Sequence, residues 1–158
     1  MTPTATAAAQ ECIFCAIARH EAEASVVHED ESVVAFMDRY PVTPGHLLVV
    51  PRRHAVGLED LDKITGGQVW AVAHDLARTL RRSTFHPEGI NLFLCDGEAA
   101  FQTVPHLHLH VIPRYTGDGW TVENLPKTLD RDRQRLDEDA QQIRAVSAHR
   151  TGGHPPGA

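Results

Sequence analysis

The sequence has no long hydrophobic run, and its apolar stretches, such as Leu47–Val50, are far too short to span a bilayer. Residues 1–10 lack the charged and apolar regions of a signal peptide, so we expect a loose tail there and a cytoplasmic protein without a membrane partner. Positive charge is not in excess either. A net charge of −6 makes the chain a poor candidate for binding nucleic acid, although histidine, arginine or backbone N–H groups can still bind one phosphate locally.

Cysteine is also scarce, with three residues, and that number is odd. Because no secretion signal is present, we expect reduced thiols in a cytoplasm, with metal binding as an alternative for some of them. The 158 residues, 42% hydrophobic and 23% charged, are enough for one domain whose core is stable without disulfide bonds or metal ions. We assign this domain to residues 11–147, between disordered tails at residues 1–10 and 148–158.

Hydrophobic spacing predicts short strands with inserted helices, and therefore an α+β fold around an antiparallel sheet of about five strands. The expected strands are Ser25–His28, Ser32–Met37, His46–Val50, Ile90–Cys95 and His106–Ile112. A short helix or turn is expected at residues 11–20. A long amphipathic helix is expected at roughly residues 66–82, begun by a capping box from Thr65 to Gln68. A C-terminal helix is expected at about residues 127–147, with a sparse apolar stripe of Leu129, Leu136, Ile143 and Val146.

Eleven histidines are the exception in this composition, and three of them alternate along one segment as His106, His108 and His110. Side chains of a strand alternate between faces at a rise of ~3.3 Å, so these imidazoles project from one face, ~6.6 Å apart. Apolar residues occupy the other face, which we expect to be the buried one, because buried imidazole nitrogens need hydrogen-bond partners. Three histidines at this spacing indicate function rather than packing.

Two chemistries suit this row of histidines, and the spacing does not choose between them. One is a three-histidine metal site of the kind that zinc hydrolases use. The other needs no metal, because the central histidine attacks phosphorus while its neighbours orient it and supply protons. Histidine suits the second role because it changes protonation near neutral pH.

The segment Gln102–Ile112, which reads QTVPHLHLHVI, closely resembles the signature of the histidine triad family: His, any, His, any, His, with apolar residues between and after. The resemblance covers roughly residues 11–120, with further matches at Cys12–Cys15, Ala35–Asp38, Pro44–Leu47, Pro51–His54 and Pro113–Arg114. It implies a nucleotide hydrolase or transferase that acts at the α-phosphate. Members are commonly homodimers whose sheets join across a two-fold axis. The stretch Pro113–Asp118 resembles bacterial members and those that cleave dinucleoside polyphosphates.

The resemblance also implies roles for individual residues. His108 would be the nucleophile that forms a nucleotidyl-histidine intermediate, from which water releases a nucleoside monophosphate. His110 and Thr103 would contact phosphate or leaving-group oxygens. His106 would hold His108 in the attacking tautomer or ligate metal. The presence of the third histidine, His110, fits the hydrolase side of the superfamily.

Four further positions correspond to substrate-binding positions of the family, and three of them carry matching residues. Asp38 would hold the ribose hydroxyls, Phe36 would help to build the base pocket, and Gln102 would face the phosphates. Cys95 departs from the pattern, because relatives usually carry there an amide side chain that touches substrate. A thiol is a weak hydrogen-bond partner, so Cys95 either alters substrate preference or is a small core residue.

A structural zinc ion is implied as well. Cys12 and Cys15 form a C-x-x-C pair, which by itself is weak evidence because two more ligands are needed. Some family members complete such a site with residues that match His54 and His106, and both are present here. The site would pin the N-terminal segment against the catalytic strand, and no organic cofactor is expected. His46 follows a Pro-Gly turn, and in relatives the matching histidine lies behind the triad.

Two other functions stay open at this point. One is a zinc-dependent hydrolase that uses His106, His108 and His110 as ligands. The other is a nucleotide-binding protein with little turnover, which Cys95 favours. The sequence does not name the substrate, because dinucleoside polyphosphates and nucleoside phosphoramidates present an α-phosphate to the same three histidines.

Overall fold

The computed structural model describes residue 9, residues 11–120 and residues 131–151, the last five of these by their backbone alone. By its contacts the chain divides into two compact units, Met1–Trp120 and Thr121–Ala158, and each is described by itself. Most of the two expected tails lies outside the described residues, and the single domain over residues 11–147 stays a prediction. Within the described ranges, no helix is long and apolar enough to cross a membrane.

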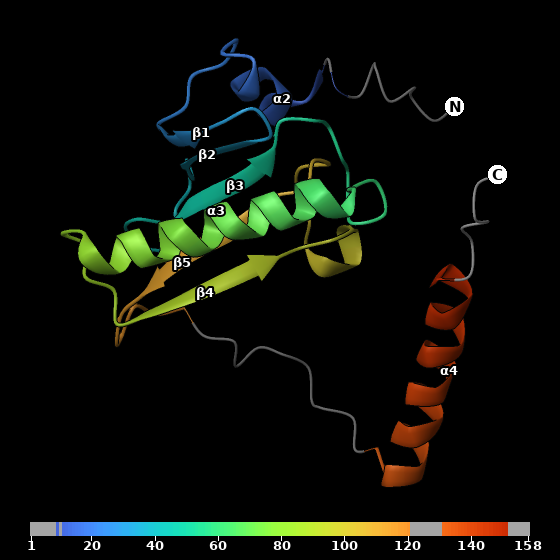
Figure 1. Ribbon diagram of the computed structural model, residues 1–158. Coiled ribbons are helices and arrows are strands. Elements are labelled where there is room, and N and C mark those ends of the chain that lie inside the picture. Colours follow the sequence, from blue (N-terminus) through green and yellow to red (C-terminus); the bar gives the residue numbers. More distant parts are fainter. Residues whose placement is uncertain (1–8, 10, 121–130, 152–158) are drawn as a thin grey trace. The chain divides into compact units, whose positions relative to one another are not determined.

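The first unit is built on one antiparallel sheet of five strands in the order β1-β2-β3-β5-β4 (Figure 1). The strands are β1 (Val26–Glu29), β2 (Val33–Met37), β3 (Leu47–Pro51), β4 (Gly89–Leu94) and β5 (Leu109–Arg114). Asp30 closes the β1–β2 hairpin, because its Oδ1 accepts the N–H groups of Ser32 and Val33. The expected α+β class with about five antiparallel strands is confirmed.

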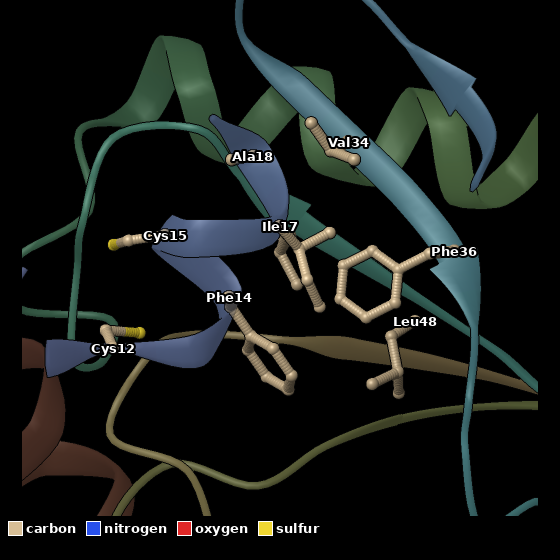
Figure 2. Close-up of a cluster of buried hydrophobic side chains, with 9 residues drawn as sticks. Cys12, Phe14, Cys15, Ile17, Ala18, Val34, Phe36 and Leu48 are labelled. Atoms are coloured by element: carbon tan, nitrogen blue, oxygen red, sulfur yellow. The ribbon is translucent and has the colours of Figure 1, made fainter. Parts of the chain in front are cut away.

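Helices cover both faces of this sheet. α3 (Lys63–Arg82) lies across one face (Figure 1) and buries Val69, Ala73 and Leu80 against it. α2 (Ile13–Ala18) packs on the opposite face, where Phe14 and Ile17 meet side chains of β2 and β3 (Figure 2). Because both faces are covered, β2 and β3 are nearly continuous apolar runs rather than alternating ones.

The histidine segment differs from the expected strand. β5 begins only at Leu109, so His106 and His108 lie in irregular backbone that leads into it. The expectation that only the leucine face is buried was also wrong, since His106 is 0% and His108 3% exposed. The reason is α2, whose Phe14 ring contacts both imidazoles edge-on, at centroid distances of 5.8 and 5.3 Å. Partners for their ring nitrogens remove the cost of this burial.

The start of α3 is a second correction. The helix begins at Lys63 rather than near residue 66, and its N-cap is Asp62 rather than Thr65. Asp62 Oδ1 accepts the N–H groups of Ile64 and Thr65, at 3.1 and 2.9 Å. Thr65 is already helical, and its hydroxyl donates to Asp62 Oδ2 at 2.7 Å. Asp62 is the N-cap because its carboxylate accepts hydrogen bonds from two free N–H groups of the first turn.

We therefore expect Asp62→Ala to lower the stability of the protein more than Thr65→Ala does. The first substitution removes the cap, whereas the second removes one hydroxyl and leaves both backbone bonds to Asp62 in place. Urea unfolding, followed by circular dichroism, measures both midpoints under the same conditions. A larger loss of stability in Thr65→Ala would instead support a capping box from Thr65 to Gln68.

The second unit contains α4 (Arg133–Thr151). It begins and ends later than the expected helix at about residues 127–147 and continues into the segment assigned to the C-terminal tail. Leu129 of the expected apolar stripe lies outside the described residues. The other stripe residues, Leu136, Ile143 and Val146, are exposed.

Candidate active site and metal cluster

His108 and His110 lie on the wall of a cavity of about 780 Å³ on the α2 side of the sheet. Their ring centroids are 4.9 Å apart. His106 does not line this cavity; it lies behind the other two, beside Cys12 and Cys15. The three histidines therefore divide between two neighbouring environments, although they alternate regularly in the sequence.

The backbone selects one tautomer of His108. Its Nδ1 lies 2.7 Å from the carbonyl oxygen of His106. A carbonyl oxygen only accepts hydrogen bonds, so Nδ1 carries the proton and Nε2 keeps its lone pair. His108 thus presents the nitrogen that a nucleophile needs. The contact that favours this tautomer comes from the backbone carbonyl of His106 rather than from its ring.

A second chain of hydrogen bonds sets the proton of His110. The N–H of Val42 donates to His46 Nδ1 at 3.1 Å, so in neutral His46 the proton is on Nε2. That group faces His110 Nδ1 at 3.0 Å and donates to it, which leaves the proton of His110 on Nε2. Burial, followed by the charges of His108 and His46, lowers the pKa of His110 to about 4. Neutral His110 is therefore a hydrogen-bond donor beside His108, with His46 behind it.

The cavity is a slot with apolar walls from α2 and the sheet and polar groups along its rim. Of the expected site residues, Phe36, Asp38, Thr103, His108 and His110 line it. The remaining lining residues are Ile13, Phe14, Ile17, Glu23, Ala24, Ser25, Met37, Arg39, Tyr40, Leu48 and Val104. Such a slot suits a flat, partly apolar ligand that carries an anionic group at the histidine end.

Asp38 directly follows β2 and lines the cavity. Its Oδ1 accepts the N–H of Tyr40 at 2.8 Å, and its Oδ2 lies 3.5 Å from His46 Nε2. Asp38, His46 and His110 place possible ligand atoms within 4.8 Å of one another. His46 nevertheless argues against a metal ion there, because Val42 occupies its Nδ1 and its Nε2 must carry the proton. We interpret this group as a hydrogen-bond network.

Gln102 and Cys95 do not line the cavity. The amide of Gln102 accepts from the N–H of Gly97 at 2.7 Å and donates to the carbonyls of Val56 and Val104, at 2.6 and 3.1 Å. It thereby ties the loop before Thr103 to a neighbouring loop. Cys95 is 5% exposed, and burial raises the pKa of its thiol. The substrate contacts expected of both residues stay predictions.

The four expected metal ligands lie together, with their donor atoms all within 4.8 Å of one another. His106 Nδ1 is 3.3 Å from Cys12 Sγ and 3.4 Å from Cys15 Sγ, and His54 Nδ1 is 3.2 Å from Cys15 Sγ. His106 Nε2 donates to the carbonyl of Pro51 at 2.9 Å, so its Nδ1 is free to accept or to ligate. Two thiols and two imidazoles, buried or half-buried, form a donor set typical of structural zinc.

The electrostatics of the cluster also fit a cation. Burial, and then the neighbouring Cys12, raises the pKa of Cys15 to about 11, so two thiolates need a positive charge beside them. His54 Nε2 is buried without a hydrogen-bond partner among the described residues. His54 therefore has its Nδ1 as the polar contact, and that atom points to the cluster.

Sequence reasoning missed several residues of the cavity. Ile13 and Ile17 could have been predicted from the sequence. They lie with Phe14 on a short helix, and three apolar side chains there need an apolar surface to pack against. Arg39 and Tyr40 directly follow Asp38 in a loop, where a charged and an aromatic side chain at a site's edge are a recognisable hint. Glu23 has no local signal, since acidic residues are common between a helix and a strand.

The chain is similar in sequence and in structure to proteins of one family. A family model described as the HIT domain matches residues 19–117. An uncharacterized HIT-like protein of Mycobacterium tuberculosis is 41% identical over 111 residues, which are 70% of this chain and 76% of the relative. A Zn-bound histidine triad family protein from Mycobacterium smegmatis is 38% identical and superposes with a TM-score of 0.67, over 87% of this chain and 99% of its own. A histidine triad nucleotide-binding protein from Candida albicans is 25% identical, with a TM-score of 0.78 over 88% and 99% of the two chains.

Proposed function

Because the chain belongs to the HIT domain family, we propose that it hydrolyses nucleotide conjugates at the α-phosphate through a nucleotidyl-histidine intermediate. The observation that carries this proposal is the tautomer of His108, whose Nδ1–H is held by the His106 carbonyl while Nε2 is left with its lone pair. The Candida albicans relative is named as nucleotide-binding, which supports a nucleotide as the ligand. Dinucleoside polyphosphates and nucleoside phosphoramidates are the proposed substrate classes.

The cavity suits a nucleoside monophosphoryl group in one orientation. The base would lie in the apolar slot against side chains of α2 and the sheet, and the ribose hydroxyls would bind Asp38. The α-phosphate would then lie against His108 and His110, with Thr103 able to donate its hydroxyl to a phosphate oxygen. The leaving group would remain outside the slot.

The reaction would proceed in two displacements at phosphorus. His108 Nε2 forms a bond to the α-phosphorus, and the bond from phosphorus to the leaving group breaks. His110 Nε2–H donates a hydrogen bond to the departing atom, which takes a proton from solvent as it leaves. A water molecule then attacks phosphorus and releases a proton to solvent. The phosphorus–nitrogen bond breaks, which releases the nucleoside monophosphate and restores His108.

The geometry supports this chemistry over a zinc-dependent hydrolase with three histidine ligands. His106 Nδ1 faces the cysteines, the Nδ1 of His108 faces a carbonyl oxygen, and the Nδ1 of His110 faces His46. Among the described residues, His106 and His110 therefore belong to two different clusters of possible metal ligands. A nucleotide-binding role with little turnover is tested directly by trapping a labelled nucleotide on the protein, because a non-catalytic binder acquires no acid-labile covalent label.

We also propose that one structural zinc ion binds Cys12, Cys15, His54 and His106, supported by the donor set and by the Zn-bound relative. When bound, it would supply the positive charge that two thiolates require. The residues of this cluster would then fix α2 over the cavity, because Phe14 lies between the two cysteines and contacts both His106 and His108. Reduced thiolate ligands suit the proposed cytoplasmic location.

A symmetric homodimer is expected, joined along the β4 edge of the sheet. β4 is six residues long and mostly apolar, and it lies at the edge of the sheet, where one side of it pairs with no other strand among the described residues. The other edge strand, β1, is shorter and carries His28 and Glu29. Sedimentation velocity over a dilution series should show a dimer at micromolar concentration. A monomer throughout that range would remove this expectation.

A further inference from the structure

The pairing of the strands gives the distance from His110 to the opposite edge of the sheet, along which the cavity extends. His110 of β5 pairs with Leu48 of β3, Leu48 pairs with Phe36 of β2, and Phe36 pairs with Val26 of β1. Three strand spacings separate His110 from Val26, which is about 14 Å. Leu48, Phe36 and His110 all line the cavity, so this row runs along its floor. The far end of the cavity therefore lies near the start of β1.

That far end is polar. Glu23, Ala24 and Ser25, which directly precede β1, line the cavity there. The carboxylate of Glu23 takes part in none of the ion pairs formed within the described residues, unlike Glu21, whose carboxylate is 2.8 Å from Arg19. The lining cation, Arg39, follows Asp38 at the end of β2 and lies over the Tyr40 ring, 6.0 Å from its centroid. A free carboxylate and a hydroxyl thus stand where the outer edge of a bound base would reach.

The three positions of a purine edge distinguish guanine from adenine at such a site. Guanine offers an acceptor, O6, beside two donors, N1–H and the N2 amino group, whereas adenine offers one amino donor beside the acceptor N1. A carboxylate accepts two parallel N–H groups but repels a ring nitrogen with a lone pair. The Ser25 hydroxyl can donate to O6. Guanine satisfies both side chains, and adenine leaves an acceptor facing an acceptor.

We propose that Glu23, with Ser25, selects guanine nucleotides in this cavity, so that the substrate is a guanosine conjugate. This inference rests on the proposed function, because it places the phosphate at His108 and hence the base at Glu23. The apolar slot itself holds any flat base, so preference between bases comes from the polar end. A bidentate pair with a base edge discriminates by roughly 1–3 kcal/mol. Because Glu23 is exposed, we expect the lower end, about a tenfold preference by the 1.36 kcal/mol rule.

The test measures nucleotide binding by calorimetry on zinc-replete His108→Asn protein, in which turnover does not interfere. GMP should bind about ten times more tightly than AMP. IMP keeps O6 and N1–H but lacks the amino group, so it should fall between them. Glu23→Gln should change the order, because the glutamine amide accepts from the adenine amino group and donates to adenine N1. Glu21→Gln is the matched control, since it removes a carboxylate two residues away outside the cavity lining.

The possible outcomes separate the two proposals. A preference for GMP that weakens or reverses in Glu23→Gln and persists in Glu21→Gln supports selection by Glu23. Equal binding of the three nucleotides, or an order that Glu23→Gln leaves unchanged, overturns it and leaves the proposed hydrolysis intact. Absence of binding by all three nucleotides, to a protein that is folded by circular dichroism, counts against the proposed function itself.

Discussion

His108→Asn should abolish turnover while the fold and nucleotide binding persist. The asparagine amide reaches roughly the position of Nδ1 and can still donate to the His106 carbonyl, so the backbone of this segment keeps its partner. It has no atom in place of Nε2, so no bond to phosphorus forms. Closing a covalent path costs several orders of magnitude in rate, roughly 4–8 kcal/mol at 1.36 kcal/mol per decade.

His110→Asn is the matched comparison. It removes the hydrogen-bond donor proposed for the departing atom but leaves the nucleophile, and one such donor typically contributes about 10²–10³-fold. We therefore expect a smaller loss than in His108→Asn. Initial rates of nucleoside monophosphate release from a phosphoramidate and from a dinucleoside polyphosphate measure both variants against the wild type.

Rapid quenching provides a second readout that a merely structural role would not move. Wild-type protein mixed with phosphate-labelled substrate should carry label that is acid-labile and base-stable, as a phosphorus–nitrogen bond is, and His108→Asn should carry none. If the His108 variant keeps more than a few per cent of the wild-type rate, the nucleophile assignment is wrong. The zinc-dependent reading of the three histidines should then be tested in its place.

Local sequence patterns predicted the elements of the fold well, because the strands are short, mostly apolar segments and proline, glycine or acidic residues lie at or near their ends. They failed where tertiary contacts decide. His106 and His108 were expected on an open face, but the short helix α2 covers them, and its packing cannot be read from the spacing of the histidines. The start of α3 was misplaced because Thr65 and Gln68 imitate a capping box, while Asp62 satisfies more of the first turn.

The site was predicted in part for a similar reason. Residues that belong to a recognisable motif, such as His108, His110 and Asp38, were found, and they meet at one cavity. The proton positions were not predictable, because they depend on Val42 and on a carbonyl oxygen, and backbone groups are the same for every sequence. Glu23 was missed because it reaches the cavity only through the pairing of the strands: it precedes β1, which lies two strands from β3 in the sheet.

The metal cluster leads to the second large effect. Wild-type protein purified without added metal should contain one zinc ion per chain, and the double variant Cys12→Ser, Cys15→Ser should contain none. Serine keeps the shape of the side chain but is a poor zinc ligand at neutral pH, since its hydroxyl stays protonated. Cys95→Ser is the matched control: it removes the third buried thiol, which lies outside the cluster, and should keep its zinc.

Loss of the ion should also lower the stability of the fold. A ligand that binds only the native state stabilises it by about 4 kcal/mol when its free concentration is a thousand times Kd. The cluster joins α2 to His54 and His106, which are far away in the sequence, so α2 should loosen first. Because α2 forms one wall of the cavity, nucleotide affinity should fall together with the melting temperature.

A chelator provides an independent measurement if the double variant does not fold. Chelation of wild-type protein should lower its melting temperature, and stoichiometric zinc should restore it, whereas magnesium should not, since Mg²⁺ prefers oxygen ligands. Cobalt substitution should produce thiolate absorption in wild type and Cys95→Ser, and none in Cys12→Ser, Cys15→Ser. Zinc content near zero in the wild type, or equal content in the double variant, would contradict the site at Cys12, Cys15, His54 and His106.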